Sequence, residues 1–166
     1  MRSSPCYWVR MSATPPDPPT GQQAHHRRLE ALYRSAPVNL LFESDLVIDE
    51  RGHATIRFAV TEAAFHAAGA AHGTLYFKMM DDAAFYAANS LISDRFLLTT
   101  AFNLHFTKAM KGGEAIAEGR WISGRRRVFV AEARIIDSSG EECARGTGTF
   151  LRSHIALASL CGYRAP

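Results

Sequence analysis

The most apolar stretch of the chain lies near its middle and has the length of a long helix. From about Gly73 to about Ser90, apolar residues occupy almost every side of a helical wheel, and this pattern predicts a helix that is buried all round. Two adjacent carboxylates, Asp81 and Asp82, interrupt the pattern. Because burial of an ionised carboxylate is unfavourable without a partner, these two residues need a structural or a functional explanation.

The segments around this helix alternate in the way that β-strands do. Two β-rich runs within residues 44–60 flank a turn at Gly52 and predict a hairpin. Strand patterns follow the helix at residues 95–106, 113–123, 125–137 and 141–152. In residues 95–106, the even-numbered side chains from Leu98 to Phe106 are expected to face one side of the sheet. The odd-numbered side chains from Thr99 to His105 are expected to face the other side. One long helix and about six strands predict an α+β domain.

A single curved antiparallel sheet covers only part of a helix that is apolar on every side. The uncovered remainder predicts a second subunit, so we expect a homodimer or a homotetramer. The sequence does not separate these two assemblies.

The ends of the chain differ in composition from its centre. Five of the seven prolines fall in the first 19 residues, so residues 1–21 are expected to form a disordered Pro-rich tail, in which Met11 offers an alternative start. Residues 22–155 are expected to form one domain that begins with a short amphipathic helix, which ends before Pro37. Residues 156–166 are expected to form a C-terminal tail.

Charge and composition exclude several classes of function. The first 28 residues carry the whole net charge of +3, so the body of the chain is neutral and lacks the basic face that nucleic-acid binding needs. No apolar run is long enough to span a membrane, and the N-terminal segment lacks a secretory pattern, so a cytoplasmic protein without a membrane partner is expected. The cysteines have no metal or disulfide spacing, and the histidines without a spacing partner are expected to be ordinary surface or strand residues: His25, His26, His53, His105 and His154.

The two carboxylates allow two interpretations. In the first, Asp81 and Asp82 emerge at the rim of the sheet and pair with a cation such as Lys78. In the second, one of them faces a reactive centre. The start of the helix favours the second interpretation, because Gly69 and Gly73 flank His72 and allow a tight turn that presents unpaired amide groups to an oxyanion.

The distance between these two features predicts where a site would form. His72 and Asp81 are separated by a helical rise of roughly 13 Å, too far for both to contact one carbonyl group within a subunit. In an antiparallel dimer, the helix start of one chain could face the carboxylate of the other.

Several short motifs occur together between Asp45 and Arg152. They are G-x-x-H-G at residues 69–73, D-x-A at residues 81–83, the Asn89-Ser90 pair and the late strand GTGTF. In this order and spacing the chain resembles the hotdog-fold acyl-CoA thioesterases of the phenylacetate-pathway (PaaI) type. The resemblance implies a curved antiparallel sheet of about six strands around one central helix, with active sites between subunits. It also implies hydrolysis of an acyl thioester to a free acid and CoA, with no metal and no cofactor other than the CoA of the substrate.

The resemblance also implies roles for individual residues. Asp81 matches the catalytic carboxylate, acting as nucleophile or as general base for water. Gly73 matches the residue whose N–H polarises the thioester carbonyl, and Thr99 matches a hydroxyl that orients water or the carboxylate. Asp82 is then secondary. His72 is expected to position its loop through backbone hydrogen bonds.

Three positions depart from the family pattern. His66 replaces a common Asn that helps to hold the carbonyl or the water, and its imidazole could donate a hydrogen bond or titrate near neutral pH. Thr74 replaces a second Gly but keeps its N–H. Ala109 replaces a common Pro, a difference that we expect to be structural.

Basic residues near the strands suggest how CoA would bind. Arg125, Arg126 and Arg127 form either a solvated strand end or a contact for CoA phosphates, because guanidinium groups match phosphate geometry. Lys108 could join them across a dimer. Two alternatives to hydrolysis stay open: a non-catalytic acyl-CoA-binding module, and an acyl-thioester hydratase or dehydratase, which the absence of a recognisable His/Glu or Asp/His dyad disfavours.

Overall fold

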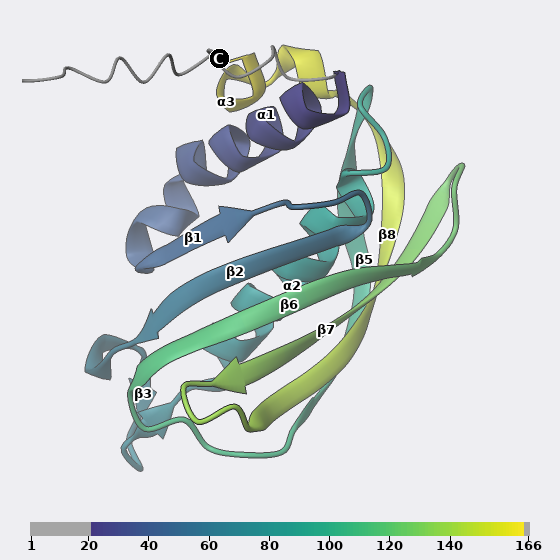
Figure 1. Cartoon of the computed structure of the whole chain (residues 1–166). Helices are drawn as coiled ribbons and strands as arrows, with labels where there is room; N and C mark the ends of the chain where they lie inside the picture. The colour runs from purple at the N-terminus through teal and green to yellow at the C-terminus, as the bar shows by residue number, and fades with distance from the viewer. Residues whose placement is uncertain (1–20, 165–166) are drawn as a thin grey trace, which may run out of the picture.

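A computed structural model describes residues 21–164 of the 166-residue chain. Its centre is a six-stranded antiparallel sheet with the order β1-β2-β6-β7-β8-β5 (Figure 1). The strands are β1 (Ser44–Val47), β2 (His53–Val60), β5 (Arg95–Phe106), β6 (Gly113–Ser123), β7 (Val128–Asp137) and β8 (Glu142–Ala156). The long helix α2 (Gly73–Asn89) lies against one face of this sheet, which confirms the predicted α+β architecture of a curved sheet around one helix. The disordered tail expected at residues 1–21 and the alternative start at Met11 lie outside the described residues, except for Gly21, which begins helix α1.

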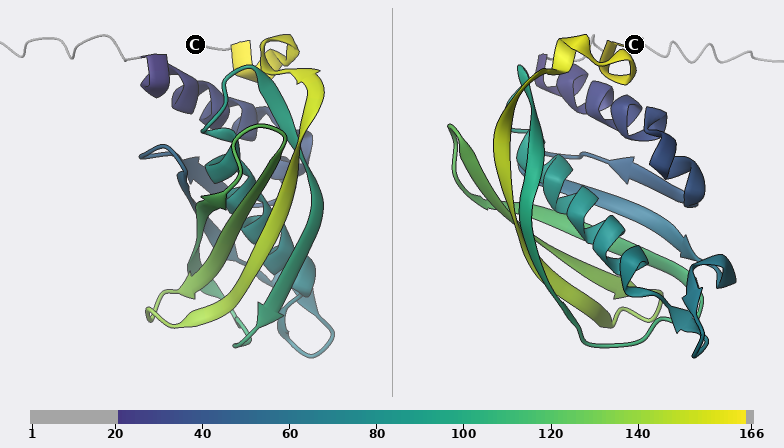
Figure 2. Two further views of the ribbon diagram at one scale, coloured as in Figure 1. Left: turned by 90° about the vertical axis from the view of Figure 1, so that its right-hand side faces the viewer. Right: turned by 180° about the vertical axis from the view of Figure 1, so that it is seen from behind.

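Helix α2 packs against β2, β6 and β7 as well as β5 and β8 (Figure 2). Its apolar side chains, among them Met79, Met80 and Ala83, are fully buried and form the centre of the core. Gly119 on β6 allows the close approach, because a Cβ atom at this position would lie 2.0 Å from the carbonyl oxygen of Ala83. Helix and sheet are therefore in direct backbone contact.

The chain itself covers the C-terminal half of α2. Helix α1 (Gly21–Ser35) and the 3-10 turn η1 (Pro37–Leu41) lie beside β1, and the Tyr33 and Tyr86 rings meet edge to face at 5.5 Å. All residues from Ala83 to Ser90 are buried as a result. The second subunit that the sequence predicts is thus not needed for this half of the helix, whereas Phe77 near the helix start stays 42% exposed.

The segment expected as a C-terminal tail is folded as far as it is described. After β8, the chain forms the turn η3 (Leu157–Ser159) and the short helix α3 (Cys161–Arg164), which packs on α1 (Figures 1 and 2). Leu157 and Tyr163 are buried in this contact. The domain therefore extends beyond residue 155, because these apolar side chains complete the layer over the end of α2.

His25 and His26 on α1 correct the expectation that they are surface residues. Both are buried. The Nδ1 atom of His25 lies 2.7 Å from the Tyr163 hydroxyl, and its Nε2 atom lies 3.2 Å from the Asn89 carbonyl oxygen. Burial lowers the pKa of both imidazoles. His25 therefore joins the first and last helices to the end of α2.

Strand β5 lies at an edge of the sheet and carries a β-bulge. Thr99 pairs with Phe150 and Ala101 pairs with Thr149, so Thr100 is the additional residue. The bulge changes the phase of alternation: Leu97 is buried, whereas Leu98 is 45% exposed, and the later even-numbered residue Phe102 again packs on the core. The regular alternation expected from Leu98 onward is therefore wrong on the N-terminal side of the bulge.

A small ribbon leads into α2. The turn η2 (Glu62–Ala64) is followed by β3 (Phe65–His66) and β4 (Ala70–Ala71), which pair with each other. Gly69 adopts a positive φ of 75° in the turn between them, a conformation that glycine accepts without steric cost. Among residues 21–164, no helix is both long and apolar enough to cross a membrane.

Candidate active site

Asp81 projects from the middle of α2 toward the bulge of β5. The Thr99 hydroxyl donates a hydrogen bond of 2.9 Å to Asp81 Oδ1. The bulge makes this contact possible, because it turns Thr99 to the helix side of the sheet just before the register shifts. The predicted pair of Asp81 and Thr99 is therefore brought together within one chain.

Asp81 has an altered acidity. Burial raises its pKa to about 6, the nearby Asp82 carboxylate acts in the same direction, and the Thr99 hydrogen bond opposes both. Asp81 forms no ion pair with any of the residues 21–164. A carboxylate with this pKa is ionised at neutral pH and is a stronger base than an ordinary aspartate.

Asp82 is held differently. It forms an ion pair with Lys78 one helical turn earlier, and Lys78 Nζ also donates a hydrogen bond of 2.6 Å to Asn39 Oδ1. The ammonium group lies 5.3 Å from the centre of the Tyr33 ring. Burial raises the pKa of Asp82 and Lys78 opposes this effect. The predicted ion pair with Lys78 thus exists for Asp82, and Lys78 in turn links α2 to η1 through Asn39.

A hollow of about 260 Å³ opens beside Asp81. One side carries the Asp81 carboxylate and Thr99, and the other sides come from η1, the end of α2 and the start of β5. Its apolar lining includes Val38, Phe85, Tyr86, Phe96, Leu97 and Leu98. The hollow therefore combines one unpaired carboxylate with walls that suit an apolar group.

The start of α2 presents a free amide. His72 is the N-cap residue, and its Nδ1 atom accepts a hydrogen bond of 3.1 Å from the Thr74 N–H and lies 3.0 Å from the Thr74 hydroxyl. His72 therefore caps the helix through a backbone hydrogen bond. The Gly73 N–H, at the first helical position, has no intrahelical acceptor and points along the helix axis. This N–H can therefore donate a hydrogen bond to an oxyanion at the start of the helix.

A second hollow, of about 350 Å³, lies beside Gly73 and is lined by His66, Tyr76, Phe106 and Lys108 among others. His66 is exposed, and its Nδ1 accepts a hydrogen bond of 3.1 Å from the Ala68 N–H. This hollow does not include Asp81. Asp81 lies eight positions after Gly73 in the helix, a rise of about 12 Å, so the carboxylate and the amide donor of one chain form two half-sites that do not meet.

The basic residues predicted to contact CoA lie at two opposite ends of β7. Lys108 forms ion pairs with Asp137 and Glu141 near the end of this strand, and these carboxylates raise its pKa. Arg125, Arg126 and Arg127 lie in the β6–β7 turn, before the strand begins. One chain therefore does not bring Lys108 to the arginine run, and Lys108 is already neutralised.

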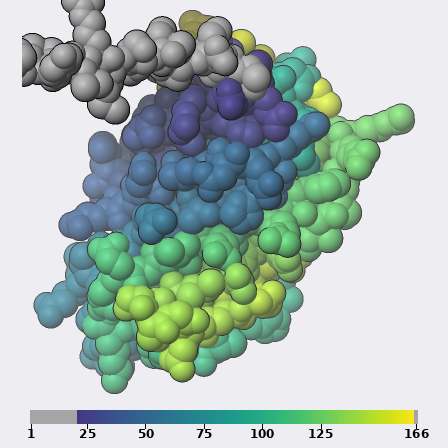
Figure 3. All heavy atoms as spheres, viewed as in Figure 1, coloured from purple at the N-terminus to yellow at the C-terminus, as the bar shows by residue number. Residues whose placement is uncertain are grey.

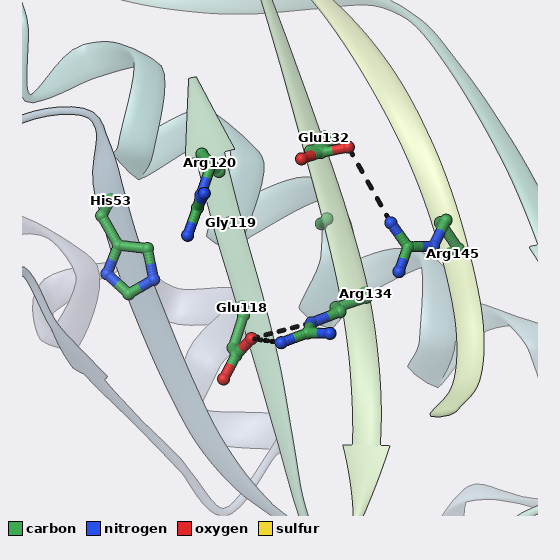
Figure 4. A pocket seen from close by; sticks show the side chains of 8 residues that line it. His53, Glu118, Gly119, Arg120, Glu132, Arg134 and Arg145 are labelled. Carbon is green, nitrogen blue, oxygen red and sulfur yellow. Dashed lines mark hydrogen bonds and ion pairs between the residues drawn. The ribbon is translucent and has the colours of Figure 1, made fainter. Parts of the chain in front are cut away.

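Another hollow, of about 200 Å³, lies on the outer face of the sheet (Figure 4). Two of its three arginines are paired across strands: Arg134 contacts Glu118 at 2.7 Å, and Arg145 lies 4.0 Å from Glu132. Arg120, the third, forms no ion pair within residues 21–164. It offers a ladder of ion pairs and no unpaired carboxylate beside an apolar wall. Within residues 21–164, no group of three or more side chains could hold a metal ion.

The fold defines the structural class of this protein. A six-stranded antiparallel sheet around one long helix is the hotdog fold. Residues 68–144, which include Gly73, Asp81 and Thr99, match the Thioesterase superfamily. A candidate esterase of Sulfurisphaera tokodaii is 32% identical over 100 residues, which cover 60% of this chain and 74% of that protein. The chain belongs to the thioesterase superfamily.

Solved structures agree with this assignment at the level of the fold. The Escherichia coli PaaI protein from the phenylacetic acid degradation operon superimposes with a TM-score of 0.74 and 18% identity, over 81% of this chain and 97% of that one. A thioesterase family protein of Silicibacter pomeroyi gives 0.71 and 21%, over 77% and 97%. The smu.793 protein of Streptococcus mutans, solved with acetyl-CoA bound, gives 0.61 and 22%, over 68% and 88%.

Proposed function

We propose that this member of the thioesterase superfamily hydrolyses acyl-CoA thioesters to a free acid and CoA, with Asp81 as the catalytic carboxylate. The observation that carries the proposal is the hydrogen bond between Thr99 and Asp81 in a hollow with apolar walls. The hydrogen bond fixes one carboxylate oxygen, and the absence of an ion pair within the described residues leaves the carboxylate available for chemistry. The apolar walls suit the acyl group of a thioester.

Two routes are compatible with this geometry. As a general base, Asp81 takes a proton from water, the hydroxide attacks the carbonyl carbon, and the C–S bond breaks as the thiolate accepts the proton. As a nucleophile, Asp81 attacks the carbonyl itself, the thiolate leaves, and water hydrolyses the resulting anhydride. In both routes the carbonyl oxygen becomes negative and needs a donor such as the Gly73 N–H.

Because the two half-sites of one chain do not meet, we propose that the complete site forms between two chains. The edge strand β5 supports this proposal, since it is twelve residues long and exposes the apolar side chains of Leu98 and Phe106. If two β5 strands pair in antiparallel fashion about an axis between Phe102 and Asn103, Thr99 of one chain lies opposite Phe106 of the other. Phe106 lines the Gly73 hollow, so this register would join the two kinds of half-site.

The first experiment measures thiol release from short, medium, long and aromatic acyl-CoA esters. Asp81→Asn is expected to lower kcat by about a hundredfold or more, because it removes the base or nucleophile. Asp49→Asn is the matched control, since Asp49 is exposed and forms no ion pair within residues 21–164. Retention of activity within about tenfold in Asp81→Asn would contradict the proposed role.

A second experiment tests the shared site. Gly73→Pro removes the N–H donor at a helical position where proline is tolerated, and the extended backbone of His72 fits a following proline. Gly73→Ala is its control, since it keeps the N–H and adds the same Cβ atom, 3.1 Å from the Phe106 ring. Mixed and refolded together, inactive Asp81→Asn and Gly73→Pro chains should recover about a quarter of wild-type activity, because half of the dimers then contain one intact site. No recovery in hybrid dimers would contradict a shared site.

The same assays separate the alternatives. A binding module would bind acyl-CoA without thiol release, and Asp81→Asn would not alter its affinity. A hydratase would consume or form a double bond conjugated to the thioester carbonyl without releasing thiol. No histidine among the described residues hydrogen-bonds to Asp81, so the dyad of such chemistry is not formed within one chain.

A further inference from the structure

The β6–β7 turn projects from the body of the protein (Figures 1 and 3). A cavity of about 310 Å³ lies at this end of the sheet. It forms between this turn, the β1–β2 turn and the residue that follows the last turn of α2. Its lining is Arg51, Leu91, Trp121, Arg125 and Phe129. None of these residues contributes to the Asp81 hollow or to the Gly73 hollow.

The aromatic side chains that line this cavity are held in place. Phe129 is fully buried and Trp121 is half-buried. The Trp121 indole N–H donates a hydrogen bond of 2.9 Å to the Gly124 carbonyl, and its backbone N–H donates one of 2.8 Å to the Gly52 carbonyl. A Cβ atom on Gly52 would touch both Trp121 and Leu91, so the β1–β2 turn packs directly on the indole. The ring is thus fixed from two sides.

Two guanidinium groups border these aromatic side chains. Arg51 Nη2 donates a hydrogen bond of 2.9 Å to the Leu91 carbonyl, which leaves most of its donors unused. The Arg125 guanidinium carbon lies 5.7 Å from the centre of the Trp121 ring. Within residues 21–164, neither arginine forms an ion pair, and the same holds for the adjacent Arg126 and Arg127.

This contrasts with the other arginine cluster of the sheet. On the outer face, Arg134 and Arg145 are each matched by a glutamate (Figure 4). At the cavity beside the β6–β7 turn, by contrast, two unpaired guanidinium groups lie next to the half-buried Trp121 ring, and no carboxylate is among the residues that line the cavity.

We infer that this cavity binds the nucleotide group of a small ligand, with a base against Trp121 and a phosphate between Arg51 and Arg125. Aromatic rings stack on bases regardless of their identity, and guanidinium groups match phosphate oxygens with paired hydrogen bonds. The cavity is at the lower end of the volumes of small-molecule sites, which fits one nucleoside phosphate and not a polynucleotide. The neutral body of the chain also argues against nucleic acid.

Two sources share this chemistry: a free nucleotide that acts as an effector, and the nucleotide end of a CoA thioester. The inference goes beyond the proposed hydrolysis, since binding can be measured without turnover. Trp121 provides the signal, and Trp8, the other of the two tryptophans, is replaced by phenylalanine to isolate it.

The first arm titrates Trp8→Phe protein with ADP, adenosine 3′,5′-bisphosphate and adenosine, and follows Trp121 fluorescence. Both phosphorylated ligands are expected to quench it saturably, and adenosine to bind at least about tenfold more weakly, because it lacks the charge-assisted hydrogen bonds. Arg51→Gln and Arg125→Gln should each lower the affinity for both phosphorylated ligands by about tenfold or more. Arg57→Gln, an exposed arginine of β2 outside the cavity, is the matched control and should bind normally. The absence of saturable quenching, or equal effects of all three arginine variants, would overturn the inference.

The second arm distinguishes the sources. If the cavity binds the substrate's own nucleotide, Arg51→Gln raises KM for acyl-CoA and leaves KM for the matching acyl-pantetheine unchanged, because the latter has no nucleotide. If the ligand is a free effector, both KM values stay the same and ADP changes kcat only in the protein with Arg51. An inactive protein that still binds nucleotides would reject the proposed hydrolysis and retain the nucleotide site.

Discussion

Thr99 donates a hydrogen bond to Asp81 across the interface of β5 and α2, although eighteen residues separate them in the chain. This bond has the opposite effect to the surroundings of the carboxylate. Burial and the neighbouring Asp82 favour the protonated form of Asp81, whereas the hydroxyl stabilises the ionised form. With these opposing effects, Asp81 is a stronger base than an ordinary aspartate and is still ionised at neutral pH.

Thr99→Val should move the acid limb of the pH–rate profile to higher pH. The wild-type limb is expected near pH 6, where Asp81 gains a proton. Valine removes the hydrogen bond that lowers this pKa, so the limb shifts upward, whereas Thr99→Ser keeps the hydroxyl and should stay near the wild-type position. The measurement is kcat/KM between pH 4.5 and 9, roughly the range over which such a carboxylate titrates. A limb that does not differ between the valine and serine variants would separate Thr99 from the acidity of Asp81.

Asp81→Asn should make the protein more stable at neutral pH. The folded pKa of about 6 exceeds the ordinary value of 3.8, so the folded state binds the proton more tightly and loses stability as pH rises from about 4 to 6. Above this window, ionised Asp81 costs up to about 3 kcal/mol, which asparagine would not incur. In urea unfolding at pH 8, Asp81→Asn should therefore have a higher free energy of unfolding than the wild type. At pH 3.5 the two proteins should differ little. Equal midpoints at both pH values would mean that the carboxylate is not destabilised by its site.

The contact between α1 and α3 should weaken on acidification. His25 has a lowered pKa because it is buried, with smaller contributions from His26, Arg28 and Arg51, while the Asn89 carbonyl opposes them. The unfolded chain therefore takes up a proton below about pH 6.5 that folded His25 resists, and the free energy of unfolding falls as pH decreases.

Hydrogen exchange of α1 at pH 5.5 and 8 provides the measurement. Tyr163→Phe, which removes the 2.7 Å contact with His25, should cost about 1 kcal/mol and speed exchange in α1 at both pH values. His25→Gln should reduce the pH dependence, whereas His105→Gln, at an exposed position, should leave it unchanged. An identical pH dependence in the two variants would assign the effect to other groups.

Gly119→Ala should severely destabilise the fold. The new Cβ atom would lie 2.0 Å from the Ala83 carbonyl oxygen, a backbone atom that can move only if α2 shifts away from β6. A cost of about 3 kcal/mol or more is expected, measured by thermal unfolding or by the yield of folded protein. Gly21→Ala, which meets no atom within 4 Å, is the control. Wild-type stability of Gly119→Ala would contradict the close packing of helix on sheet.

The elements that are encoded locally could be predicted from the sequence. The range of α2 follows from its apolar run, and the hairpin follows from Gly52, whose φ of 86° is the positive value that its turn requires. The pair of Lys78 and Asp82 follows from helical spacing. These features depend on residues within one or two turns of each other.

Features that depend on distant contacts could not be predicted in the same way. Nothing in the local pattern of β5 marks Thr100 as the bulged residue, because the bulge depends on pairing with β8. The burial of His25 depends on Tyr163, 138 residues away. The ion pairs that neutralise Lys108 likewise depend on Asp137 and Glu141, which lie 29 and 33 positions away in the chain.

The contact between His25 and Tyr163 also sets an order of events during synthesis. Helix α1 leaves the ribosome long before Tyr163, whose hydroxyl its histidine contacts across 138 positions of the chain. His25 can reach the Asn89 carbonyl earlier, but its second ring nitrogen has to wait for Tyr163, and long-range contacts of this kind form slowly because a large loop must close. The position of α1 over the end of α2 is thus completed in steps as the chain emerges.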